Sequence, residues 1–236
     1  MDLRYEDIAG MIDHSLLNPT FTRDQLEAGC QLAVTYKVAS VCIMPYYLKR
    51  CAAILAGSGV QPSTVIGFPH GGHTTTIKLA EARQALADGG KELDMVVNIS
   101  AVLSGDWDYV TREIQAVCEA THAGGAKLKV IFENCFLSDE QKVALCGICG
   151  RLGVDWVKTS TGYGSGGAMD ADLKLMRANS PAAVQVKAAG GVRTLDRAIE
   201  VRELGCTRFG CTATKPILDE LRQRLGLPPM GESPQR

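Results

Sequence analysis

The sequence carries almost no net charge and contains no long apolar run. Its 25 lysines and arginines against 26 aspartates and glutamates leave a net charge of -1. Such a balance creates no field that would attract nucleic acid or an anionic membrane, so any phosphate must be bound locally. No stretch approaches about eighteen uninterrupted apolar residues, and the first twenty residues lack the apolar core of a signal peptide. We therefore expect a soluble, cytoplasmic protein without nucleic-acid or membrane partners.

The sequence is also poor in patterns for metal or disulfide chemistry. His70 and His73 flank two glycines, but no carboxylate or cysteine stands beside them at a familiar ligand spacing. The nine cysteines are an odd number and follow no disulfide framework. Cys146 and Cys149 form a C-x-x-C pair inside a helical pattern, which favours packing over redox chemistry. We expect no metal site and no disulfide.

Short β-rich segments recur at even spacing, with amphipathic helical patterns between them. Their starts lie near Met11, Ser40, Thr64, Glu92, Lys127, Asp155, Val184 and Cys206. Eight strand and helix units in a chain of 236 residues predict an α/β protein with a (β/α)8 TIM barrel, and a doubly wound open sheet is the alternative. We expect a single domain over residues 1–225. A disordered tail over residues 226–236 follows from GLPPMGESPQR, rich in proline, glycine and polar residues.

Capping patterns and an apolar stripe mark the helices. Thr22 with Gln25, and Ser138 with Gln141, each place a hydroxyl three residues before a glutamine, which predicts reciprocal caps at two helix starts. Apolar residues at helical spacing over 107–117 predict a third helix.

Two lysines lie inside apolar strands, where lysine is disfavoured by burial. These are Lys158 in WVK and Lys187 in VQVK. Burial beside a second cation favours the neutral amine, which is the form that attacks a carbonyl to give an imine. Asp94 on a third strand is a candidate proton shuttle or a counter-ion of a lysine. A packed stem with its charged head in water is the ordinary alternative for one lysine, but the group of three favours a catalytic site.

Glycine-bearing turns follow the last two strands. Gly190 and Gly191 come after VKAA, and Gly210 to Thr212 precede the last helix. TIM barrels bind phosphate at this place, through backbone amides at helix N-termini. Simple tight turns are the equal alternative for either turn alone. Gly162 to Gly167 also satisfy G-x-G-x-x-G, which raises a nicotinamide-dependent oxidoreductase, but about twenty residues later the chain offers Lys187 instead of a ribose-binding acid.

Seven segments together resemble the deoxyribose-phosphate aldolase family. They are IDHSLLNP (12–19), VCIMP (41–45), VIGFPHG (65–71), ELDMVVN (92–98), VKTSTG (157–162), VKAAGGVRT (186–194) and RFG (208–210). The resemblance extends over nearly all of residues 8–215. It implies a class I lyase of deoxyribonucleotide catabolism that reversibly cleaves 2-deoxy-D-ribose 5-phosphate to acetaldehyde and D-glyceraldehyde 3-phosphate, without metal or organic cofactor.

The resemblance also implies a role for each site residue. Lys158 forms the Schiff base, Lys187 tunes it, and Asp94 joins Lys187 in proton transfer through water. Substrate and phosphate contacts are expected from Asp13, Cys42, Thr159, Gly162, Gly190, Gly191, Gly210 and Thr212.

Three features depart from the family's pattern. The turn after the last strand reads Gly-Cys-Thr-Ala, so Thr212 is its only hydroxyl. Tyr163 and Met169 stand unexpectedly in the turn after Lys158, and the tail lacks a terminal tyrosine. A related Schiff-base aldolase for another small sugar or aldehyde is therefore the alternative. A binding protein that had lost the chemistry would be expected to lack one of the three catalytic candidates. A homodimer is compatible with these features.

Overall fold

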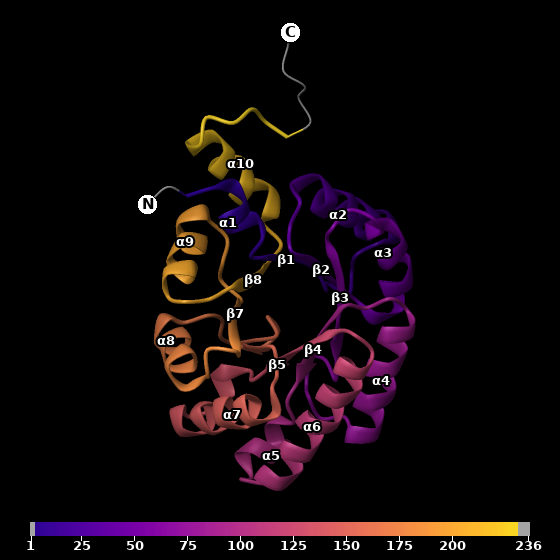
Figure 1. Cartoon of the computed structure of the whole chain (residues 1–236), viewed down its shortest axis with the longest axis vertical. Helices are drawn as coiled ribbons and strands as arrows, with labels where there is room; N and C mark the ends of the chain where they lie inside the picture. The colour runs from indigo at the N-terminus through magenta and orange to yellow at the C-terminus, as the bar shows by residue number, and fades with distance from the viewer. Residues whose placement is uncertain (1–2, 231–236) are drawn as a thin grey trace.

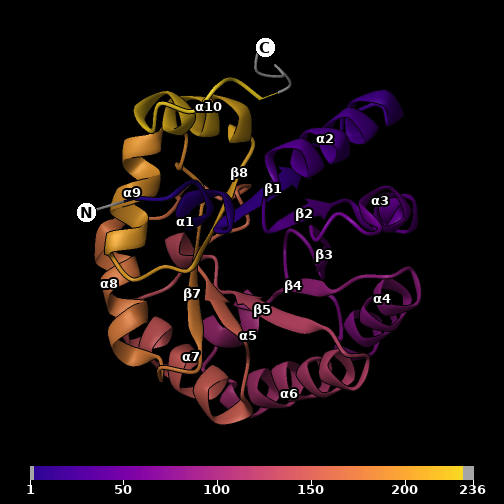
Figure 2. The ribbon, with the colours of Figure 1, turned by 45° about the horizontal axis from the view of Figure 1, so that its top comes forward.

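Eight parallel strands form a closed barrel surrounded by helices in the computed structural model, which describes residues 3–230 (Figures 1 and 2). The strands are β1 (Ile12–Leu16), β2 (Ser40–Ile43), β3 (Gln61–Ile66), β4 (Glu92–Val96), β5 (Lys127–Ile131), β6 (Trp156–Lys158), β7 (Gln185–Ala189) and β8 (Arg208–Cys211). Each strand pairs with the next one in the chain, and β1 pairs with β8. The predicted TIM barrel is confirmed, and the open sheet is excluded.

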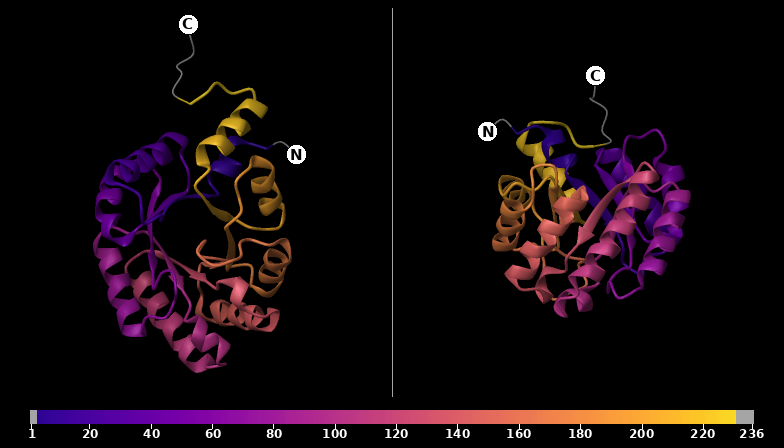
Figure 3. Two further views of the ribbon diagram at one scale, coloured as in Figure 1. Left: turned by 180° about the vertical axis from the view of Figure 1, so that it is seen from behind. Right: turned by 60° about the horizontal axis from the view of Figure 1, so that its bottom comes forward.

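Helix α1 precedes β1, and the other helices follow the strands and form the outer layer, which Figure 3 shows from behind. They are α1 (Tyr5–Ala9), α2 (Arg23–Tyr36), α3 (Leu48–Leu55), α4 (Thr75–Ala87), α5 (Ile99–Leu103), α6 (Trp107–Ala123), α7 (Asp139–Leu152), α8 (Asp170–Asn179), α9 (Leu195–Glu203) and α10 (Thr214–Arg224). Two 3-10 turns, η1 (Pro45–Tyr47) and η2 (Asn134–Phe136), follow β2 and β5. Both predicted capping boxes are confirmed, at Thr22 for α2 and at Ser138 for α7.

Strand starts lie close to the predicted positions except in β3. This strand begins at Gln61, three residues before the expected Thr64. Gln61, Pro62 and Ser63 do not read as a strand, because proline cannot donate a ladder hydrogen bond and the neighbours are polar. The backbone nevertheless pairs there, since Gln61 N donates to Ala39 O and Pro62 O accepts from Lys91 N. Pairing on both sides therefore outweighs the local preference.

Inward and outward faces of the strands differ sharply in polarity. Outward residues such as Ile12, Val41 and Phe209 belong to one buried apolar layer between strands and helices. Inward residues such as Asp13 and Lys129, which contact each other across the barrel, are charged. TIM barrel interiors are usually filled with branched apolar side chains. A polar interior is therefore the first structural sign of a site.

The C-terminal residues described by the structure continue past α10. Leu227 N donates to Arg222 O at 2.8 Å, and the Arg222 guanidinium donates to Pro228 O at 2.7 Å. Residues 231–236 of the expected tail lie outside the described residues. Over residues 3–230, no helix combines the length and the hydropathy that a membrane crossing needs.

A buried ion pair fixes the carboxyl end of β4. Lys78 on α4 donates to Glu113 on α6 at 2.8 Å and to Val96 O at 2.8 Å, and both side chains have no exposed surface. We predict that Glu113→Leu lowers the free energy of unfolding by about 3–5 kcal/mol, because it leaves the Lys78 ammonium buried without a counter-charge. Urea denaturation measures this loss. The double variant with Lys78→Met should lose less, and an unchanged single variant would contradict the prediction.

Candidate active site

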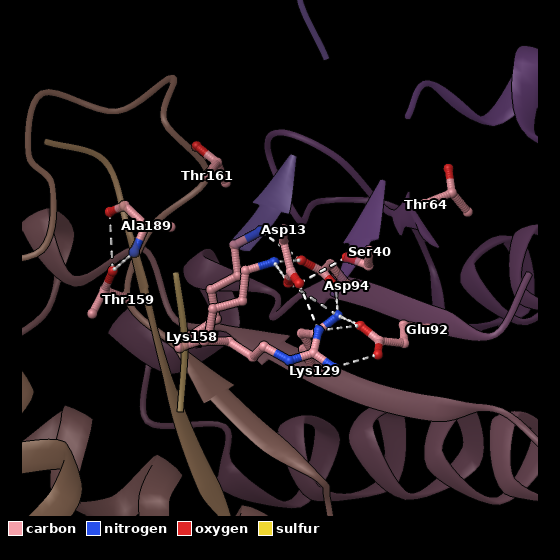
Figure 4. A network of polar contacts seen from close by, with 12 residues as sticks. Asp13, Ser40, Thr64, Glu92, Asp94, Lys129, Lys158, Thr159, Thr161 and Ala189 are labelled. Carbon is pink, nitrogen blue, oxygen red and sulfur yellow. Dashed lines mark hydrogen bonds and ion pairs between the residues drawn. The ribbon is translucent and has the colours of Figure 1, made fainter. Parts of the chain in front are cut away.

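A cavity of about 560 Å³ opens at the carboxyl ends of the strands. Most of the site residues predicted from the sequence line it, namely Asp13, Cys42, Lys158, Gly162, Lys187, Gly190, Gly191, Gly210 and Thr212. Asp94 lies buried beneath the two lysines and contacts both. Thr159 is buried as well, where its hydroxyl donates to Ala189 O and accepts from Ala189 N, so that it joins β6 to β7 (Figure 4).

Lys158 and Lys187 lie side by side at the floor of the cavity. They are register partners on β6 and β7, so both side chains enter the barrel interior. Each ammonium nitrogen lies 2.7 Å from the same oxygen, Oδ2 of Asp94. Lys187 also lies 2.5 Å from Oδ2 of Asp13. The two amines therefore share counter-ions, and protonation of one is coupled to the charge of the other.

The two lysines differ in the direction of their pKa shifts. Burial is the largest influence on Lys158 and, together with the positive charge of Lys187, it outweighs the attraction of Asp94 and lowers the pKa of Lys158 below its usual value. Burial also acts on Lys187, but Asp13 and Asp94 together outweigh it and raise the pKa of Lys187. Lys158 is therefore the more readily neutral amine, and Lys187 is the charged neighbour. This is the division of labour that imine chemistry requires.

Further charged residues below the lysines complete the cluster, and no sequence pattern had indicated them. Lys129 on β5 lies 2.9 Å from Oδ1 of Asp94 and 2.5 Å from Glu92. Arg208 on β8 lies 2.6 Å from Asp13 and 2.8 Å from Glu92. Lys129 stands within the apolar run LKVIF, the same signal that pointed to Lys158. Because Lys129 lies close to the charged start of the strand, it did not stand out in the sequence as a lysine inside an apolar segment.

The cluster contains four basic and three acidic side chains. The basic ones are Lys129, Lys158, Lys187 and Arg208, and the acidic ones are Asp13, Glu92 and Asp94. Four positive charges against three negative ones leave one excess positive charge in a buried space, which is unfavourable. Release of the proton from Lys158 brings the cluster to neutrality. Burial opposes ionisation of Asp13 and Asp94, but the neighbouring cations hold the pKa of both carboxyl groups below the usual range.

Glu133 anchors the loop that follows Lys158. Its backbone adopts a left-handed conformation with φ of 57°, which is unfavourable for a residue with a side chain. Its buried carboxylate accepts hydrogen bonds from the backbone N–H and the hydroxyl of Thr161, a residue that lines the cavity. Gly164 packs closely against the same carboxylate. The loop after β6 is thus held by Glu133, in the segment that follows β5.

The glycine turn after β7 and the end of β8, which contains Gly210, form another wall of the cavity. Gly190 and Gly191 have φ of 83° and 91°, which only glycine adopts easily. The exposed Arg193, which was not among the residues predicted from the sequence, follows them and also lines the cavity. At the start of α10, Thr214 pairs with the buried ring of His14 at 2.8 Å. Burial lowers the pKa of His14 to about 4, so this ring is neutral at physiological pH.

The weaker sequence patterns lie apart from Lys158 and Lys187 or are packed against protein. Gly164 and Gly166 of the G-x-G-x-x-G pattern pack on Glu133 and Cys135, and α8 begins only at Asp170. His70 and His73 are exposed. Within residues 3–230 no group of three or more histidine, cysteine or acidic residues has the arrangement of a metal site. All nine cysteines are free thiols, and Cys146 and Cys149 are buried in the core.

Comparisons with known proteins place the chain in a family. The family model described as DeoC/LacD family aldolase matches residues 8–212. A deoxyribose-phosphate aldolase of Rhodopirellula baltica is 64% identical over 96% of this chain and 94% of its own. One of Thermococcus gammatolerans is 43% identical over 92% of this chain and 97% of its own. The tetrameric deoxyribose phosphate aldolase of Aeropyrum pernix superimposes with a TM-score of 0.86 at 29% identity, covering 94% and 93% of the two chains. The chain belongs to the DeoC/LacD family of aldolases.

Proposed function

We propose that this protein is a deoxyribose-phosphate aldolase that cleaves 2-deoxy-D-ribose 5-phosphate through a Schiff base on Lys158. The observation that carries the proposal is the pair of lysines that share Asp94 at the floor of the cavity, with the pKa of Lys158 lowered and that of Lys187 raised. Membership of the aldolase family and the names of its close relatives support the substrate. The homodimer and the cytoplasmic location expected from the sequence stay predictions.

The reaction begins when the neutral amine of Lys158 attacks the aldehyde carbon C1 of the sugar. Loss of water gives a protonated imine. The hydroxyl on C3 then gives up its proton, the bond between C2 and C3 breaks, and its electron pair enters the imine to form an enamine. D-glyceraldehyde 3-phosphate leaves, the enamine takes a proton at C2, and water hydrolyses the imine to acetaldehyde and free amine. No step requires a metal or an organic cofactor.

Lys187 and Asp94 are the proposed proton carriers. Lys187 lines the cavity and is charged, so it can deliver a proton through a water molecule to the enamine carbon. Asp94 contacts the amines of both lysines and can relay a proton between them without moving. Asp13 holds Lys187 from the other side. The same cluster therefore keeps one amine reactive and stores the proton that the reaction must return.

The phosphate group of the substrate is proposed to bind at the glycine turn after β7 and at the carboxyl end of β8. Backbone amides near Gly190, Gly191 and Gly210 are the neutral donors, and the exposed guanidinium of Arg193 supplies positive charge at the same wall. A hydroxyl comes from Thr212. This arrangement would place the aldehyde end of the sugar at the lysines when the phosphate is anchored.

Reduction of the imine tests the nucleophile directly. We predict that acetaldehyde with borohydride adds one reduced two-carbon adduct per chain, located on Lys158 by peptide mass spectrometry, and inactivates the protein. Lys158→Ala should give neither adduct nor cleavage, whereas Lys174→Ala, an exposed lysine on α8, should behave as the parent. Cleavage retained by Lys158→Ala would remove this lysine from the nucleophile role.

The pH profile tests the role of Lys187. Because only neutral Lys158 reacts, and its pKa is lowered, kcat/KM should rise with pH through that lowered pKa. Lys187→Leu removes the neighbouring positive charge, and Asp94 then acts on Lys158 alone of the two lysines. The pKa of Lys158 should therefore rise, and the ascending limb of the pH profile should move to higher pH. Turnover near neutral pH should fall by about 100-fold or more, since proton transfer is lost as well. A limb that stays in place, or moves to lower pH, would contradict this electrostatic role.

Arg193 tests the phosphate site. We predict that Arg193→Ala raises KM for 2-deoxy-D-ribose 5-phosphate by about tenfold to 100-fold, because a hydrogen bond to a charged group contributes about 1.5–3 kcal/mol. Steady-state kinetics with unphosphorylated 2-deoxy-D-ribose should show no such rise, and Arg151→Ala, on α7, is the control. An equal rise for both sugars would place the effect elsewhere than at the phosphate.

A further inference from the structure

A second cavity of about 390 Å³ lies beside the catalytic one, over the loops that follow β2 and β3. Its lining is mostly apolar and includes Met44, Val65 and Phe68. The only charged residue among the described residues that line it is Glu81, whose carboxylate already accepts a hydrogen bond from Gly67 N at 2.6 Å. The volume falls in the range of about 300–1,000 Å³ that is typical of small-molecule sites. An anionic group would find no cationic partner in this lining.

The side chain of Tyr163 forms the wall between the two cavities. Tyr163, Leu17 and Pro19 line both of them. The Tyr163 hydroxyl donates a hydrogen bond of 2.7 Å to Leu17 O, which joins the loop after β6 to the loop after β1 across the mouth of the barrel. Its ring packs edge-on against Phe68, with centroids 5.5 Å apart. These two contacts hold the ring in place although 51% of the residue is exposed.

We propose that Tyr163 is a specificity-determining residue, and that the apolar cavity behind it takes the chain of an apolar, unphosphorylated acceptor aldehyde. The proposal rests on the proposed aldolase function and concerns its synthetic direction. An acceptor without phosphate has no anchor at the glycine turns, so burial of its apolar chain must supply the binding free energy. The second cavity offers that burial, borders the catalytic cavity along their shared lining residues, and has no cation among its described lining residues that would favour a phosphate.

The chemistry is the same carbon-carbon bond formation with a different acceptor. Lys158 forms the enamine of acetaldehyde, and the enamine carbon attacks the carbonyl carbon of the acceptor. The acceptor oxygen takes a proton and becomes a hydroxyl. Water then hydrolyses the imine, which releases the β-hydroxyaldehyde and restores the amine. All atoms of the product come from the two aldehydes, and no oxidant or reductant is needed.

Removal of the Tyr163 side chain should merge the two cavities. With acetaldehyde as donor, kcat/KM is measured for hexanal and for D-glyceraldehyde 3-phosphate as acceptors. We expect Tyr163→Ala to raise the ratio of these two constants, hexanal over the phosphorylated acceptor, by about tenfold or more, as expected when room for a few methylene groups is gained. A ratio that stays within about twofold of the parent would overturn the proposal.

Two further variants separate the cavity from the hydrogen bond. Tyr163→Phe keeps the ring and its contact with Phe68 but loses the bond to Leu17 O, so its ratio should remain near that of the parent. Tyr163→Ala combined with Met44→Trp refills the apolar cavity from its other wall and should bring the ratio back toward the parent value. A rise in Tyr163→Phe as large as in Tyr163→Ala, or a rise that survives Met44→Trp in a variant with unchanged thermal unfolding, would show that the acceptor does not occupy this cavity.

Trapping with borohydride distinguishes failure of the proposed role of Tyr163 from failure of the proposed aldolase function. If acetaldehyde leaves an adduct on Lys158 in the parent and in each variant, the aldolase mechanism holds, and an unchanged acceptor ratio refutes the role of Tyr163 alone. If the parent forms no adduct, the proposed function itself fails.

Discussion

The rest of the site depends on the ion pairs that the carboxylate of Asp94 makes with neighbouring lysines. Its two oxygens accept from Lys129, Lys158 and Lys187, which come from three consecutive strands. Three ammonium groups can approach one another only because an anion lies between them. Strand pairing fixes the distances among these three groups. Closure of the barrel therefore also sets the charges around Lys158 and, with them, the reactivity of its amine. Misplacement of any of these strands would change the charge that Lys158 experiences.

The interior cluster is better explained by chemistry than by stability. Buried ion pairs lose much of their attraction to desolvation, and apolar replacements of the same volume are often as stable. The apolar layer between strands and helices, with Ile12 and Phe209 as members, supplies the burial that stabilises the fold. The contacts of Trp156 with the cations of Lys129 and Arg208, at 5.5 Å and 5.0 Å from the ring centroid, complete the lower part of the interior. A barrel can thus hold charges inside when its outer layer carries the packing.

The barrel and the meeting of Lys158, Lys187 and Asp94 inside it could be predicted because both leave local signals in the sequence. Repeating strand and helix patterns predict the fold, and lysines inside apolar strands are anomalies that attract attention. Glu92 and Arg208 gave no such signal, because a charge at the start of a strand is usually solvated. Their role depends on which residues face inward at the same level, and this requires the register. The hold of Glu133 on Thr161 is likewise invisible in sequence, since it joins two loops through a backbone conformation that no pattern announces.

Alternation along β1 has one more consequence, for the accuracy of folding. A shift of the strand by one residue would direct Ile12 and His14 into the ionic interior and Asp13 into the apolar layer. In such a pairing, several charged side chains would be buried at once without partners. The charged cluster therefore penalises wrong alignments more steeply than an apolar interior would, where neighbouring side chains are nearly interchangeable. The charged side chains around Lys158 therefore also favour the correct register of the strands when the barrel folds.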